Sequence, residues 1–167
     1  MKKFNLLFLL FLCLIITGCT SNDSKDVGSL NDFESTCINN GFNVNDDMDE
    51  YKDVDYVSEA KVATLDDTTI QMVVYDNSDN AEKVQDEQID YFMTLKGSGS
   101  IINNDKGKNY YHFDMISNGY YMVTSRIDNT LVFTKTLLKN KERVDNIFKE
   151  FNYWASKKML FYFKHSF

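Results

Sequence analysis

Two short turns between alternating apolar runs constrain this chain more than any other feature of its sequence. Asn118-Gly119 separates YYHFDMIS from YYMVTSRI, and Asp128-Asn129 separates YYMVTSRI from TLVFTKT. Asn-Gly favours a type I′ turn, which needs a positive φ at both central residues, and Asp-Asn can form the same turn at a higher cost. The pattern therefore predicts a three-stranded antiparallel meander over residues 109–136.

Two-residue turns also fix the register of the meander and divide its side chains between two faces. The expected pairs are Met115 with Met122, Phe113 with Thr124, Arg126 with Leu131, and Thr124 with Phe133. The predicted core face carries Tyr111, Phe113, Met115, Met122, Leu131 and Phe133. The second face carries Tyr110, His112, Asp114, Tyr121, Val123, Ser125, Val132 and Thr134.

The second face is apolar enough that its full exposure would form an unusual patch. Either the end of the chain covers this face, or the face binds a partner. Tyrosine-rich surfaces with polar surroundings suit contacts with a protein or a glycan. The partner-binding residues predicted on this basis are Tyr110, His112, Tyr121, Val123 and Val132.

Periodicity outside the meander predicts helices and two more strands. Helices are expected from Ser29 to about residue 41, to about residue 95 after a cap at Ser78 or Asp79, and over about 140–151. Ser29 and Asp32 are expected to form a capping box at the start of the first helix. Strands are expected at 56–63 and 68–75. Residues 96–108 are expected to form a flexible loop. The fold class is therefore α+β in the order α-β-β-α-β-β-β-α, a two-layer sandwich with two to three helices on one face of an antiparallel sheet of about five strands.

The N-terminus has the layout of a bacterial signal peptide, predicted over residues 1–18. Lys2 and Lys3 precede an uncharged apolar run that is too short to span a bilayer comfortably. This run ends in Ile16-Thr17-Gly18-Cys19, which resembles the lipobox of bacterial lipoproteins. The resemblance implies cleavage before Cys19, acylation of Cys19, and anchoring on the extracytoplasmic side of the cell membrane. An ordinary secretory signal or a short membrane anchor is the alternative.

Cys37 would be the remaining thiol, because Cys13 leaves with the signal peptide and Cys19 is acylated. No intramolecular disulfide is then expected, although the compartment would permit one. Cys37 shares a predicted helix face with Leu30 and Phe33, so we expect a core residue rather than a nucleophile.

Charge is distributed unevenly along the chain. Residues 20–100 hold 19 Asp and Glu against 5 Lys and Arg, whereas residues 101–167 hold 6 against 11. An acidic body does not suit nucleic acid, which we exclude as a partner.

Two acidic segments, residues 43–55 and the segment that starts at Asp76, were compared with calcium-binding loops. An EF-hand loop needs oxygen ligands at alternate positions, Gly at the sixth and Glu at the twelfth. No starting residue in the stretch 43–55 fits this pattern; counting from Asp76, Glu87 is twelfth but Ala81 is sixth. No metal site is predicted, and small-molecule or calcium binding by the acidic loops remains the alternative function.

The sequence completes no catalytic or cofactor motif. Gly97-Ser98-Gly99-Ser100 belongs to neither a P-loop nor a G-x-G-x-x-G pattern. His112, Asp114 and Ser125 can be grouped on the second face, but they lie on predicted strands without an evident cleft. We therefore expect no enzyme, no catalytic residue and no cofactor, and a weak hydrolase is the less favoured alternative.

The two ends of the mature chain differ in character. Residues 19–28 are small and polar after the lipidated cysteine and predict a flexible tether to a single domain over 29–153. Residues 154–167 (WASKKMLFYFKHSF) form a basic, aromatic tail. It either extends the last helix or adds a strand, or it touches the anionic membrane surface or a partner.

Three motifs in the body resemble a group of small uncharacterised lipoproteins of Gram-positive bacteria. They are Gly41-Phe42 at a helix end, Ser125-Arg126-Ile127-Asp128-Asn129-Thr130-Leu131, and Phe151-Asn152-Tyr153. The resemblance implies a surface location but no activity and no functional residues. The sequence thus predicts a lipid-anchored lipoprotein that acts as a non-catalytic binding or accessory domain.

Overall fold

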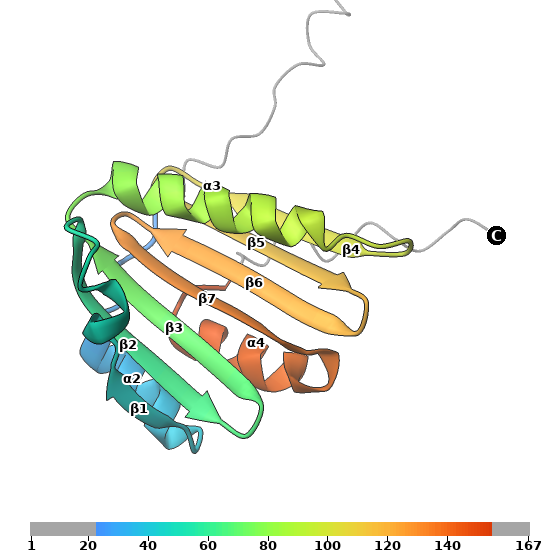
Figure 1. The fold of residues 1–167 in the computed structure, drawn as a ribbon, viewed down its shortest axis with the longest axis horizontal. Coiled ribbons are helices and arrows are strands. Elements are labelled where there is room, and N and C mark those ends of the chain that lie inside the picture. Colours follow the sequence, from blue (N-terminus) through green and yellow to red (C-terminus); the bar gives the residue numbers. More distant parts are fainter. Residues whose placement is uncertain (1–22, 155–167) are drawn as a thin grey trace, which may run out of the picture.

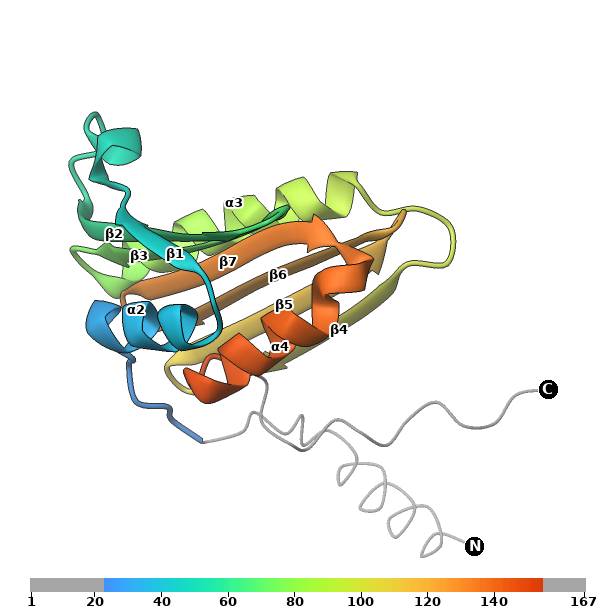
Figure 2. The same ribbon diagram turned by 90° about the horizontal axis from the view of Figure 1, so that it is seen from below.

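The computed structural model describes residues 23–154 as a three-layer domain. A seven-stranded antiparallel sheet in the order β1-β2-β3-β7-β6-β5-β4 forms the middle layer. Helix α3 (Ser78–Thr94) lies on one face, and α2 (Leu30–Asn39) and α4 (Lys141–Glu150) lie on the other (Figures 1 and 2). The strands are β1 (Asn43–Asp46), β2 (Val57–Leu65), β3 (Thr68–Tyr75), β4 (Ile101–Lys106), β5 (Tyr110–Ser117), β6 (Tyr120–Ile127) and β7 (Thr130–Leu137), with 3-10 turns η1 (Met48–Tyr51) and η2 (Leu138–Asn140). The predicted signal peptide, Cys19 and residues 155–167 of the predicted tail lie outside the described residues.

The predicted meander is confirmed as β5, β6 and β7. All four expected pairs occur, from Met115 with Met122 to Thr124 with Phe133. Asn118 and Gly119 have φ values of 51° and 80°, as a type I′ turn requires. In the second turn only Asp128 has a positive φ, of 49°, so the expectation of a second type I′ turn is wrong.

The α+β class is confirmed, but the sheet is larger than the predicted five strands. Strand β1 lies in the acidic stretch, and β4 lies in the segment predicted to be a flexible loop. Both are edge strands, which form one ladder and tolerate polar side chains on both faces. Their sequences, NVND and IINNDK, therefore lack the alternation by which strands are recognised.

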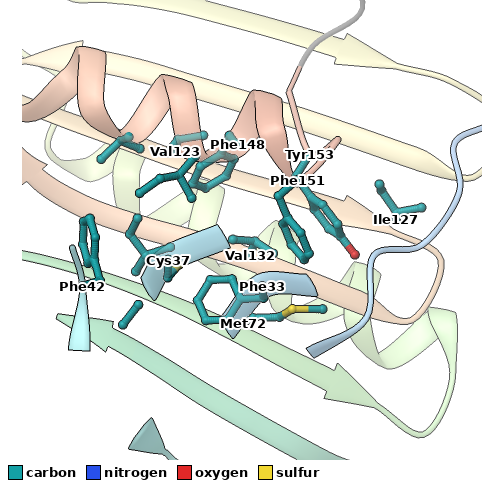
Figure 3. Packing of buried hydrophobic residues seen from close by; sticks show 14 of the residues in the cluster. Phe33, Cys37, Phe42, Met72, Val123, Ile127, Val132, Phe148, Phe151 and Tyr153 are labelled. Atoms are coloured by element: carbon teal, nitrogen blue, oxygen red, sulfur yellow. The ribbon is translucent and has the colours of Figure 1, made fainter. Parts of the chain in front are cut away.

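Helices cover both faces of the sheet, so the predicted two-layer arrangement is wrong. On the α3 side, Phe92 packs with Phe113, Met115 and Met122. On the other side α2 and α4 pack on the predicted second face in the largest apolar cluster, part of which Figure 3 shows. Members of this cluster include Phe33, Cys37, Tyr110, Tyr121, Val123, Val132, Val144, Ile147, Phe148 and Phe151.

Helix ends follow local side-chain chemistry. At α2 the Ser29 hydroxyl accepts a hydrogen bond from the Asp32 amide at 3.1 Å, and the Asp32 carboxylate accepts one from the Ser29 amide at 3.0 Å, which forms the predicted capping box. Gly41, with φ 85°, ends this helix. Helix α3 is capped by Asn77, whose side chain accepts from the Asn80 amide, and not by Ser78 or Asp79 as predicted.

Candidate functional site

The residues predicted to bind a partner are core residues. Tyr110, His112, Tyr121, Val123 and Val132 are each at most 1% exposed. The apolar stripe of α4 and the residues that follow it cover this face, which is the physical reason for its apolar character. The surface that the sequence suggested for partner binding is therefore not exposed, and that prediction is wrong.

His112 and Ser125 meet at a backbone carbonyl and not at each other. The Ser125 hydroxyl donates to the Tyr153 carbonyl oxygen at 2.6 Å, and His112 Nδ1 lies 3.2 Å from the same oxygen. His112 Nε2 lies 3.4 Å from Asp114 Oδ2, and the Trp154 ring packs over the imidazole at 4.9 Å. These contacts hold Tyr153 and Trp154 on the sheet. The Ser125 hydroxyl donates to a carbonyl and not to the imidazole base that would activate a nucleophilic serine.

The half-buried Lys141 and the buried Asp145 of α4 lie against Tyr121 of the sheet. Lys141 Nζ lies 2.5 Å from Asp145 Oδ2 and 4.7 Å from the centre of the Tyr121 ring. Burial, with the Asp114 and Asp145 carboxylates nearby, raises the pKa of Tyr121 far above its usual value. The sequence did not single out Lys141 and Asp145 as site residues. Their i, i+4 spacing on α4 is also that of an ordinary exposed ion pair on a helix.

The α3 side of the sheet is the less covered one. Among the described helices, none lies over the first half of β3 and the second half of β7 in the view of Figure 1, whereas α3 packs on Val73 and Tyr75 farther along β3. Thr69 and Lys135 are exposed there, and Gln71 and Phe133 are half-buried. The open sheet surface thus lies on the face that the sequence predicted to be the core face.

Two exposed tyrosines flank a lysine at one end of this open surface. Tyr91 of α3 is 51% exposed, and Tyr120 at the start of β6 is 41% exposed. Lys135 Nζ lies 5.4 Å from the centre of the Tyr91 ring and 5.3 Å from that of Tyr120. Leu137, the strand partner of Tyr120, is also exposed. We call Tyr91, Tyr120, Lys135 and Leu137 the tyrosine patch.

The outer face of α3 is acidic but is not organised as a metal centre. Its exposed carboxylates are Asp79, Glu82, Asp86, Glu87 and Asp90. Arg126 and Lys106 each lie 3.6 Å from a Glu82 oxygen. In the loop directly before α3, Asp76 Oδ1 accepts hydrogen bonds from the side-chain amide nitrogens of Asn77 and Asn80. Within residues 23–154, no three His, Cys, Asp or Glu side chains gather in a way that could hold a metal ion.

The segment before α2 contacts the domain, although the sequence predicted a flexible tether over residues 19–28. The Lys108 amide donates to the Asp23 carbonyl at 3.0 Å, and Lys25 and Asn109 share two hydrogen bonds. Gly28 lies against the Phe151 ring, where a β-carbon would come within 2.6 Å of a ring atom. From Asp23 onwards the segment belongs to the domain, so the tether prediction is wrong for residues 23–28.

The described helices are all too short or too polar to cross a membrane. No protein-family model matches the chain, and no curated protein matches it. Among solved structures, a GTP binding regulator from Thermotoga maritima is similar at 19% sequence identity and a TM-score of 0.45, over 77% of this chain and 90% of that one. A likeness this distant indicates no function.

Proposed function

We propose that this protein is a lipid-anchored lipoprotein on the extracytoplasmic side of the cell membrane, and that its domain is a non-catalytic binding or accessory module. The lipobox Ile16-Thr17-Gly18-Cys19 supports the anchor. Asp23 is already hydrogen-bonded to the domain, and it follows Cys19 by four residues. An extended chain of that length spans at most about 14 Å, so the anchor would hold the domain close to the lipid surface.

The tyrosine patch is the contact surface of this module. The observation that carries this assignment is the exposure of Tyr91 and Tyr120 on either side of Lys135, on a sheet face that no described helix covers there. Exposed aromatic residues are enriched at the centres of protein interfaces. Lys135 lies near both ring centres, where a sugar ring would have to stack, so the patch favours a protein partner over a glycan.

Site-specific photo-crosslinking in intact cells tests this function. The photoreactive residue replaces Tyr120, and a control replaces Tyr56, which is also exposed, at 36%, but stacks on Tyr75 near the other end of the sheet. We expect a discrete adduct with another protein from position 120 and none from position 56. Equal labelling from both positions, or none from either, would contradict the assignment.

The double substitution Tyr91→Ser and Leu137→Ser provides a second test of the tyrosine patch in the same crosslinking experiment. Because both side chains are exposed, stability should change by no more than about 0.5 kcal/mol each. The adduct from position 120 should nevertheless disappear. A persistent adduct would mean that the contact does not use the patch.

A further inference from the structure

Residues 151–154 follow α4 and lie on the sheet, and we call them the C-terminal strap. The Phe151 and Tyr153 rings belong to the apolar cluster shown in Figure 3. The Lys25 ammonium donates to the Trp154 carbonyl from the segment before α2. Buried polar side chains of β5 and β6 hold the strap at a third point, the Tyr153 carbonyl oxygen.

The Tyr153 carbonyl determines where one proton of His112 lies. Its oxygen accepts a hydrogen bond from the Ser125 hydroxyl at 2.6 Å, and His112 Nδ1 lies 3.2 Å from the same oxygen. A carbonyl oxygen only accepts, so it bonds to both side chains when Nδ1 carries a hydrogen. A neutral imidazole has a single N–H, so its Nε2 would then present a lone pair.

That lone pair would face a buried carboxylate. His112 Nε2 has no hydrogen-bond partner among the described residues, and it lies 3.4 Å from Asp114 Oδ2. Asp114 is 3% exposed, and its other oxygen, Oδ1, accepts from Asn103 Nδ2 at 3.0 Å. A lone pair and a carboxylate repel each other at this separation, whereas a second N–H on His112 converts the contact into an attraction between opposite charges.

We propose that His112 is a pH-sensitive latch that holds the C-terminal strap on the sheet. In the closed state the imidazolium donates from Nδ1 to the Tyr153 carbonyl and from Nε2 to the Asp114 carboxylate. When the Nε2 proton passes to solvent, a lone pair is left against Asp114 and the strap is released. The latch therefore contributes most in acid and is lost as the pH rises. Histidine is the side chain whose charge most often changes near neutral pH.

Other titratable groups face the latch from each neighbouring element. They are Asp105 of β4, which is the strand partner of His112, Tyr121 of β6, Lys141, Asp145 and Lys149 of α4, and Lys25 of the segment before α2. Burial lowers the pKa of Lys25, which also holds the strap. A test of the latch must therefore separate His112 from Lys25.

Trp154 reports on the latch directly. It is the single tryptophan, and its ring centre lies 4.9 Å from that of His112. A protonated imidazole in contact with an indole ring quenches its fluorescence more strongly than a neutral one. In protein purified from cells that make the full chain, the emission of Trp154 should rise between pH 5 and pH 9. Its quenching by added acrylamide should rise severalfold over the same transition, because the strap is released.

His165→Asn is the matched control, since His165 is the other histidine of the chain. This variant should keep both changes. Acrylamide quenching that does not depend on pH, in the native chain or in His165→Asn, would overturn the proposal.

Asp114→Asn tests the latch with His112 in place. The new side-chain oxygen can accept from Asn103 while the new amide donates to a neutral Nε2, so the strap no longer needs a second proton on His112. At pH 8 we expect high emission together with the low acrylamide quenching of the closed strap. Lys25 is unchanged in this variant, so release caused by Lys25 would persist. Release at the same pH as in the native chain would overturn the proposal.

Discussion

Lys25 and Asn109 hold each other by two hydrogen bonds: the Lys25 amide donates to Asn109 Oδ1 at 2.9 Å, and Asn109 Nδ2 donates to the Lys25 carbonyl at 2.9 Å. The pair connects the N-terminal segment to the start of β5, 84 residues away in the sequence. Through it, the segment before α2 is tied to the sheet.

Removing this pair should free the N-terminal segment. In Asn109→Ala both hydrogen bonds to Lys25 and one to Asp128 are lost, so we expect about 2 kcal/mol less free energy of unfolding and faster hydrogen exchange at residues 23–28. Urea unfolding and exchange mass spectrometry measure the two effects. The exposed Asn104→Ala is the control, and unchanged exchange in Asn109→Ala would contradict the docking.

The covering of the second sheet face by α4 can be tested on adjacent residues of that helix. Ile147 is fully buried and Asn146 is exposed. Ile147→Ala should lower the free energy of unfolding by about 3 kcal/mol, because it leaves a cavity against the sheet. Asn146→Ala should change it by no more than about 0.5 kcal/mol. Similar small effects from both substitutions would mean that α4 does not close this face.

Local patterns predicted the meander correctly because its turns and strand alternation involve neighbouring residues. The pairing of Met115 with Met122 follows from Asn118-Gly119 alone. Edge strands β1 and β4 were missed because they bury few side chains and so show no period. The two hydrogen bonds between Lys25 and Asn109 join residues that are far apart in the sequence, so no local pattern predicts them.

The candidate site was misplaced for a related reason. Alternation separates Tyr121 from Met122 but does not indicate which face receives which helix. Both faces of the meander are apolar, so the assignment depends on where α4 packs, which is a tertiary property. The exposure of Tyr120 depends on where α3 lies on the sheet, which is also a tertiary property and cannot be predicted from the local sequence.

The Cys37 thiol should be unreactive in the folded protein. Its side chain is fully buried, and burial raises its pKa from 9.0 to about 12. At pH 8 a thiol reagent should therefore label Cys37 only as fast as the domain opens, and rapidly in strong denaturant. Rapid labelling without denaturant would contradict the burial of α2 against the sheet.

The capping box of α2 gives stability a defined dependence on pH. Hydrogen bonds from the Ser29 side chain and backbone lower the pKa of Asp32 below its usual value of 3.8. The lowered pKa means that the carboxylate stabilises the fold above pH 3.8, and that this contribution is lost as the pH falls through the lower folded value. The difference in Tm between the native chain and Asp32→Asn should therefore be present at pH 6 and shrink in acid. A difference independent of pH would mean that the ionised carboxylate is not what caps the helix.

The lipid anchor is the central claim of this account, and mass spectrometry of the mature N-terminus tests it most directly. Protein purified from the membranes of cells that make the full chain should begin at Cys19 and carry the added mass of acyl chains on that residue. Cys19→Ala should remove the added mass and prevent cleavage after Gly18. An N-terminus at another residue, or an unmodified Cys19, would contradict the account.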